Sequence, residues 1–160
     1  MKKDTEIIGR IKNSLSGLAF ADVKNASAGG ATMGAFILGS CFIDYLAGFY
    51  YGHRSQKDDY INFANKYLKK YGGERLYYSM RNGLVHNYSV ERDFVFSEKG
   101  IDGPHFGKYK NGKIVLNLED FISDLEAAMN KYFKAIEHDE ELKKRAIRRF
   151  KRGKMLEVLR

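Results

Sequence analysis

The sequence predicts a mostly helical protein with one small β element, and three observations lead to this fold class. The 160 residues include one proline and no tryptophan, and 44% of them are hydrophobic, which is enough for a core. Apolar residues recur at helical spacing over most of the chain. The spacing changes to two only between Phe94 and Leu116, so we expect a β-hairpin at about 93–118, before the last long helix.

Two helices are expected in the first third of the chain. The first runs from about Asp4 to Val23, with apolar residues on one face, and is broken by the segment 25–30, which ends in Gly29-Gly30. Residues 31–52 are apolar nearly all round, which predicts the central core helix. This length also suits a membrane span of ~20 residues. Asp44 would cost roughly 2.5 to 3.5 kcal/mol at a bilayer centre, so we prefer the core helix and expect no membrane partner.

The remaining elements are signalled by capping and turn residues. A third helix opens at 55–59, with acids in its first turn, and Gly72-Gly73 closes it. Asn111-Gly112 lies between two alternating segments, which predicts an antiparallel hairpin. We interpret His105, on this element, as an exposed loop histidine rather than a site residue. The last long helix starts near Asn117.

The positive charge is concentrated at the end of the chain. The net charge is +8, and residues 143–160 carry all of it, because residues 1–142 contain equal numbers of acids and bases. This divides the chain into a helical domain, 1–142, and a basic C-terminal helix or tail, 143–160. A basic segment suits an RNA backbone, although charge runs are also common at solvated chain ends. The candidate nucleic-acid-binding residues are Lys143, Lys144, Arg145, Arg148, Arg149, Lys151 and Arg152.

Cysteine and histidine usage excludes several classes of site. Cys41 is the single cysteine, so neither an intrachain disulfide nor a multi-cysteine metal site is expected. The histidines lack metal-ligand spacing, and no glycine-rich phosphate loop is followed by Lys-Ser/Thr. We therefore expect no metal and no cofactor. The N-terminus does not have the pattern of a secretory signal, which favours a cytoplasmic location.

One short segment gathers most of the side chains with chemical potential. Arg81, Asn82, His86 and Tyr88 lie within eight positions, among apolar residues at spacings that suit a partly buried helix. Residues five apart on an ideal α-helix differ by about 140° around the axis, so Arg81 and His86 would not share a face. They could act on one substrate only if the helix ended near His86 or a second copy of the chain completed the site.

The segment Arg81 to Tyr88 has the form Arg-x4-His-x-Tyr, with a polar residue after the arginine. It resembles the signature of HEPN domains, and in particular of HEPN toxins that pair with a nucleotidyltransferase antitoxin. The resemblance implies an antiparallel helical bundle that forms a homodimer, so that two motifs meet in one cleft. It also implies a metal-independent endoribonuclease, acting as a toxin or defence component, with RNA as substrate and a nucleotidyltransferase-type antitoxin as a partner.

The chemistry of RNA cleavage without metal matches these residue types. One group must take the 2′-hydroxyl proton, another must protonate the departing 5′-oxygen, and positive charge must stabilise the phosphate. His86 can exchange protons, and Arg81 can supply the charge. The resemblance implies that Asn82 orients the phosphate or the histidine and that Tyr88 bonds near the scissile group.

Other interpretations of the same residues remain open. The motif residues could be structural, with His86 capping the helix, Arg81 paired with a carboxylate such as Asp44, and Tyr88 packing. Asp44 itself could be either a supporting acid of the site or a structural acid. A HEPN-like module could also bind nucleic acid or nucleotides, or mediate assembly, without catalysis. A peripheral membrane protein that uses its basic end on anionic lipid is a third class.

Overall fold

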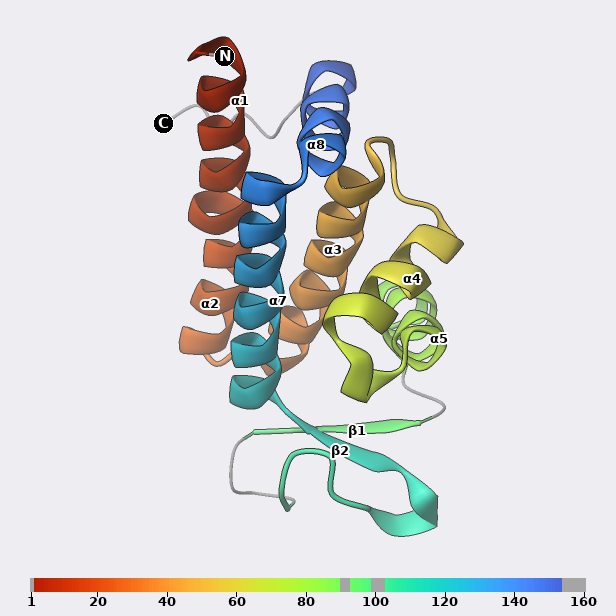
Figure 1. The fold of residues 1–160 in the computed structure, drawn as a ribbon. Helices are drawn as coiled ribbons and strands as arrows, with labels where there is room; N and C mark the ends of the chain where they lie inside the picture. Colours follow the sequence, from red (N-terminus) through yellow and green to blue (C-terminus); the bar gives the residue numbers. More distant parts are fainter. Residues whose placement is uncertain (1, 90–92, 99–102, 154–160) are drawn as a thin grey trace.

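The computed structural model describes residues 2–89, 93–98 and 103–153 and confirms a mostly helical protein with a small sheet (Figure 1). The described helices and strands, in chain order, are α1 (Lys2–Asn13), η1 (Ser14–Ala19), α2 (Phe20–Ala28), α3 (Thr32–Tyr51), α4 (Lys57–Tyr67), η2 (Lys69–Tyr71), α5 (Gly73–Leu76), η3 (Tyr77–Leu84), α6 (Val85–Asn87), β1 (Phe94–Ser97), η4 (Lys110–Gly112), β2 (Ile114–Asn117), α7 (Leu118–His138) and α8 (Glu140–Arg152). The sheet lies at one end of the helical bundle, and α8 lies at the other.

The first helix is longer than expected because α1, η1 and α2 follow one another without a break. Its middle part, η1, is a π-helix, and the buried Ser14 there forms a 3.2 Å hydrogen bond with the Tyr45 hydroxyl of α3. The helix ends before Gly30, whose φ of 76° is unfavourable for residues with a side chain. The expected break therefore lies at 29–31 rather than at 25.

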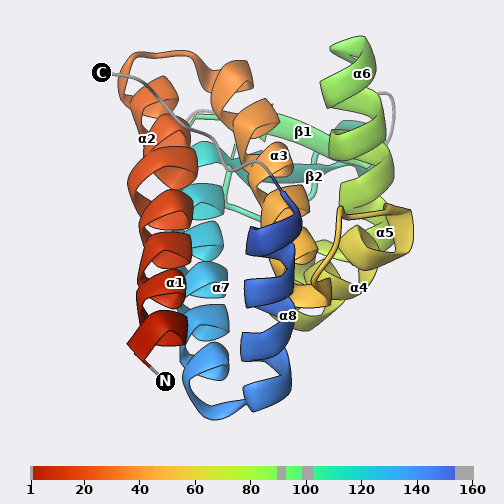
Figure 2. The same ribbon diagram turned by 90° about the horizontal axis from the view of Figure 1, so that it is seen from above.

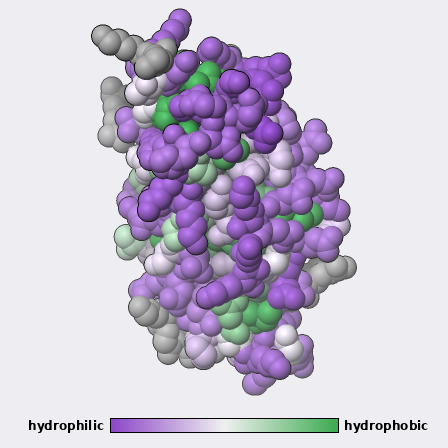
Figure 3. Space-filling model, viewed as in Figure 1, coloured by the Kyte–Doolittle hydropathy of each residue, from purple (hydrophilic) through white to green (hydrophobic). Residues whose placement is uncertain are grey.

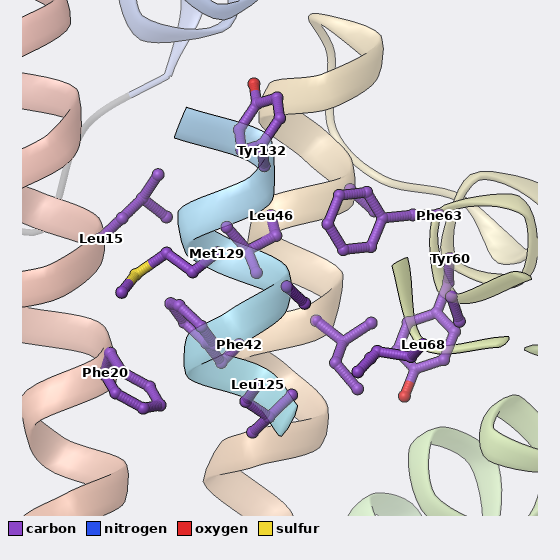
Figure 4. Packing of buried hydrophobic residues seen from close by; sticks show 14 of the residues in the cluster. Leu15, Phe20, Phe42, Leu46, Tyr60, Phe63, Leu68, Leu125, Met129 and Tyr132 are labelled. Carbon is purple, nitrogen blue, oxygen red and sulfur yellow. The ribbon is translucent and has the colours of Figure 1, made fainter. Parts of the chain in front are cut away.

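The apolar segment 31–52 forms the core helix, as predicted. Helix α3 contacts α2, α4, α7 and α8, and Figure 4 shows Phe42 and Leu46 among side chains from several of these helices. In the described part of the chain, α3 is the one helix long and apolar enough to cross a membrane. Its 18-residue apolar window is 56% buried inside the bundle, which is typical of a core helix.

Helix α4 begins two residues after the expected start and has a capping box. The Gln56 side chain accepts from the backbone of Asp59, and Asp59 accepts from the Gln56 backbone at 2.9 Å. Gly73 does not close this helix but starts α5, where its backbone N–H donates to Asn65 at 2.7 Å. A Cβ on Gly73 would clash with the carbonyl of Ile61, so glycine is required for this close approach.

The predicted antiparallel pairing of the Phe94 segment is wrong. Strands β1 and β2 pair in parallel, with Phe94 opposite Ile114 and Ser97 opposite Asn117. The Asn111-Gly112 turn does form, with both residues at positive φ, but it reverses the chain between Lys108 and β2, where an antiparallel bridge joins Lys108 to Ile114. The Asn111-Gly112 signal therefore correctly predicted a turn between Lys108 and β2. Strand β1 pairs with the other edge of β2.

The basic segment, as far as Arg152, belongs to a helix. Helix α8 runs from Glu140 to Arg152 and buries Leu142, Ala146 and Ile147 against the bundle. The domain boundary expected at 142/143 thus falls inside a helix that contacts α1, α3 and α7 (Figure 2). Residues 154–160 of the expected tail lie outside the described residues.

The two sides of the core are filled by different types of side chain. Leu15, Phe20 and Met129 fill the side of α3 nearest α1, α2 and α7. Tyrosine and phenylalanine dominate the side nearest α4, and the Tyr60 hydroxyl bonds to buried Ser40 at 3.1 Å. The face seen in Figure 3 is mainly hydrophilic, with small separate hydrophobic patches.

Candidate functional site

The motif lies on a helix whose hydrogen bonding is not α-helical. Segments α5, η3 and α6 form one helix from Gly73 to Asn87, and its central part, Tyr77–Leu84, is a π-helix. Hydrogen bonds from i to i+5 widen the helical turn, so residues five apart come to lie on nearly the same face. Arg81 Nη1 and His86 Nε2 are 3.2 Å apart. The π-helix thus removes the separation expected on an ideal α-helix, within a single chain.

The direction of this hydrogen bond indicates which ring nitrogen of His86 accepts and which carries a proton. A guanidinium has only donors, so Arg81 donates and Nε2 of His86 must accept. With Nε2 as the acceptor, the single proton of a neutral imidazole lies on Nδ1. If Arg81 turns away, the lone pair on Nε2 is free to take a proton from a hydroxyl group.

Asp44 holds the same arginine from the other side. Its Oδ2 accepts from Arg81 Nε at 2.9 Å, and the two side chains are 25% and 27% exposed. The carboxylate lies on the core helix α3, which packs against η3. It therefore anchors the guanidinium and leaves Nη1 directed to His86. The structure brings three of the predicted residues, Asp44, Arg81 and His86, into one chain of contacts.

The other two motif residues lie beside this chain of contacts rather than in it. Asn82 is exposed, and Tyr88 is 68% exposed. Tyr88 adopts a left-handed conformation with φ 50° and ends the helix, where its N–H donates to the Leu84 carbonyl at 3.0 Å. Within the described chain, no hydrogen bond joins either side chain to Arg81 or His86.

Gly83 permits the close packing of this helix end. A Cβ at this position would lie 2.9 Å from the Ser89 carbonyl oxygen and 3.1 Å from the Tyr78 carbonyl oxygen. Because real Cβ atoms are essentially never found within 3.0 Å of such an atom, the chain after Tyr88 could not fold back here with a larger residue.

A polar cavity of about 260 Å³ adjoins the Arg81–Asp44 pair. One face of α3 lines it with residues spaced three and four apart, namely Cys41, Asp44, Tyr45 and Gly48. Its other walls come from the α3–α4 loop (Arg54 and Ser55), from η3 (Arg81) and from α8 (Arg149). Three guanidinium groups against one carboxylate leave this cavity with an excess of positive charge.

The candidate RNA-binding residues of α8 do not form one uniform surface. Lys143 and Lys144 are paired with Glu140 and Glu141, at 2.5 and 2.9 Å. Arg148 donates to the carbonyl oxygens of Gly52 and Tyr51, which attaches α8 to the end of α3. Of the remaining predicted residues, Arg149 lines the cavity. Lys151 and Arg152 are exposed, and Arg145 is half-buried.

The structure also forms a histidine network that sequence reasoning missed. His105, expected to be an exposed loop residue, has a side chain only 12% exposed. Its Nδ1 accepts from the Asn117 backbone at 3.0 Å, and its Nε2 lies 3.0 Å from the Tyr71 hydroxyl. Tyr71 donates in turn to Asp124 at 2.8 Å. These residues are up to 53 positions apart in sequence, so no local pattern could have connected them.

Burial sets the protonation of this second network. Desolvation lowers the pKa of His105, although Asp120 and Asp124 partly oppose the shift. Burial also raises the pKa of Tyr71, and the charge of Asp124 adds to the effect. Both groups are therefore neutral near pH 7, and the network connects the sheet to α7 as a structural element.

Within residues 2–89, 93–98 and 103–153, no group of three or more His, Cys, Asp or Glu side chains lies close enough together to hold a metal ion. Comparison with protein-family models, with curated proteins and with solved structures found no match for this chain. Function is therefore inferred from the motif and from the geometry around it.

Proposed function

We propose that this protein is a metal-independent endoribonuclease of HEPN type. The observation that carries the proposal is the 3.2 Å contact between Arg81 and His86 on a π-helix, with Asp44 bonded to the same arginine. A cation and a neutral imidazole side by side supply the two functions that cleavage by the 2′-hydroxyl needs, phosphate stabilisation and proton transfer.

The proposed reaction begins with the neutral His86. Its Nε2 takes the proton of the 2′-hydroxyl, whose oxygen attacks the adjacent phosphorus. Arg81 turns its two terminal nitrogens from His86 to the phosphate and stabilises the developing charge, while Asp44 keeps Nε in place. The 5′-oxygen leaves with a proton, and the products are a 2′,3′-cyclic phosphate and a 5′-hydroxyl.

The departing oxygen needs a proton donor, and we propose that a homodimer supplies it. An antiparallel HEPN-like bundle that pairs two chains along the motif helix would place a second His86 across the scissile bond. Asn82 and Tyr88 are exposed beside Arg81 and His86, and this position suits contacts with the RNA or with the second chain. Activity of this kind fits a cytoplasmic toxin or defence component, held in check by a nucleotidyltransferase-type antitoxin.

Replacement of His86 tests the proposal. His86→Ala should lower the cleavage rate of single-stranded RNA by ~10² to 10⁴-fold, which is the usual contribution of a general acid or base. Arg81→Lys should also be severely impaired, because one ammonium cannot replace a forked guanidinium. The measurement is product formation by gel, with circular dichroism as a check on folding. Near-full activity of folded His86→Ala would exclude this mechanism.

A second candidate function is a HEPN-like module that binds nucleic acid or nucleotides without cutting them. The cationic cavity next to Arg81 favours it, because binding there needs no proton transfer. Wild-type protein that bound RNA tightly but left varied single-stranded RNAs intact would establish this second function in place of the first.

A further inference from the structure

The cavity between α3, η3 and α8 is lined by an arginine, Arg149, that has one donor atom without a hydrogen-bond partner among the described residues. Arg149 Nε is buried, and within the described chain it has no hydrogen-bond partner. A buried donor without an acceptor is unfavourable, because the group has lost its water and gained nothing in return. This donor of Arg149 is therefore one hydrogen-bond acceptor short.

The packing of α3 shows how the guanidinium reaches this position. A Cβ on Gly48 would lie 3.0 Å from the His53 carbonyl oxygen, so glycine allows this close approach of the loop, and Arg149 Nε lies beside the same position, 3.4 Å from where the Cβ would be. Arg54 enters the same cavity from the α3–α4 loop. Asp44, the one carboxylate of the lining, is already bonded to Arg81.

The charge balance then defines the ligand. With Asp44 paired to Arg81, Arg54 and Arg149 are the cations of the cavity lining that lack a carboxylate partner within it. Guanidinium groups bind tetrahedral oxyanions through forked, charge-assisted hydrogen bonds. A volume of about 260 Å³ equals several water molecules at roughly 30 Å³ each, so a phosphate group fits.

We propose that this cavity is a phosphate-binding site in which Arg54 and Arg149 are the ligands. The site does not depend on RNA cleavage, and it would exist in either of the two functions above. Its phosphate could belong to an RNA backbone, as a diester, or to a free or terminal phosphate, as a monoester. The shared chemistry is the oxyanion, and the experiment separates the two sources.

Cys41 makes occupancy of the site measurable. It is the single cysteine of the chain, it is exposed, and it lines the cavity. Partial desolvation raises the pKa of its thiol, although Arg81 acts in the opposite direction. Alkylation by neutral iodoacetamide should therefore be followed at mildly alkaline pH. A phosphate bound in the cavity should slow alkylation, as measured by mass spectrometry.

The experiment compares inorganic phosphate, a nucleoside monophosphate, and a 2′-O-methyl oligoribonucleotide without terminal phosphate, which cannot be cleaved. Each is tested against sodium chloride at equal ionic strength. Protection by phosphate but not by chloride supports the site. If the oligonucleotide protects at lower concentration than the monophosphate, the natural ligand is a backbone diester, and the reverse order indicates a monoester. Equal alkylation in all four solutions would overturn the proposal.

Matched variants locate the effect. Arg149→Gln and Arg54→Gln should each weaken phosphate protection by about tenfold or more, since each removes a charge-assisted contact. Arg75→Gln, an exposed arginine on α5 outside the cavity lining, should leave protection unchanged. If Arg149→Gln fails to fold, Arg54→Gln in the loop still decides the question. Undiminished protection in folded Arg54→Gln, or an equal loss in Arg75→Gln, would show that the anion binds elsewhere.

Discussion

Two π-helical segments, η1 and η3, interrupt two long helices of this protein, and only η3 contains titratable side chains. Both are attached to neighbouring residues of α3: Ser14 of η1 bonds to Tyr45, and Arg81 of η3 bonds to Asp44. The first is a neutral bond near the core. The second is a partly exposed ion pair beside a cationic cavity.

The difference shows that π-helical geometry is not by itself a sign of function. The geometry changes which residues share a face, and the residue types at those positions determine whether chemistry is possible. In η3 the widened turn joins Arg81 to His86, whereas η1, with sequence SLSGLA, has no titratable side chain. A π-helix is informative here because it unites an arginine and a histidine five positions apart.

The glycines of the two segments should respond in opposite ways to alanine, and this is the largest effect we expect on stability. Gly17 in η1 has nothing within 4 Å of an added Cβ, so Gly17→Ala should stabilise the protein by roughly 0.5 to 1 kcal/mol. Gly83→Ala should destabilise it by about 1 to 3 kcal/mol, because the added Cβ would overlap the Ser89 carbonyl oxygen. Urea unfolding measures both changes, and a stabilised Gly83→Ala would contradict the packing described for the motif helix.

The two attachments to α3 should separate stability from activity. Ser14→Ala removes a part-buried neutral bond and should cost about 0.5 to 1.5 kcal/mol, with RNA cleavage unchanged. Asp44→Asn should cost about 1 kcal/mol at most, since the pair is partly exposed, but should lower cleavage by about tenfold through loss of guanidinium positioning.

Asp44→Glu serves as the conservative control, because it keeps the charge and should recover part of the lost cleavage rate. If Asp44→Asn loses stability but keeps its full cleavage rate and pH profile, Asp44 is a structural acid. The comparison of the two π-helices would then be one of packing alone.

The smallest expected effect concerns His105, the buried counterpart of His86. Its pKa is lowered by burial, so the unfolded chain binds a proton more readily than the folded protein does. This contribution to stability is fully present above about pH 6.5, the unperturbed value, and is lost as the pH falls toward the lowered pKa.

The pH dependence of unfolding tests this contribution. The pKa of Glu137 and of Glu141 is lowered by hydrogen bonds to Lys12 and Lys144, which places their titration below this range. Unfolding measured from pH 7.5 to about pH 5 should therefore show a slope that His105→Gln reduces. If the slope is unchanged in His105→Gln, the pH dependence of unfolding comes from another titratable group and not from His105.

Local sequence was sufficient to predict the helical class, the core helix at 31–52, the apolar face of the first helix and the helical setting of Arg81 and His86. These features depend on periodicity, capping and composition, which are properties of short segments. The Asn111-Gly112 turn belongs with them, because two adjacent residues at positive φ are enough to specify it.

Long-range packing was needed for the parallel partner of β1, the place of α8 in the bundle, the His105 network and the cavity. Each depends on residues far apart in sequence, such as Asp44 with Arg81 or Gly48 with Arg149, whose meeting is set by how whole helices pack. The same holds for the π-helix that joins Arg81 to His86. Spacing of five residues predicted separate faces, and the observed contact exists because this helix, packed against α3 and α4, adopts a wider turn than an isolated α-helix would.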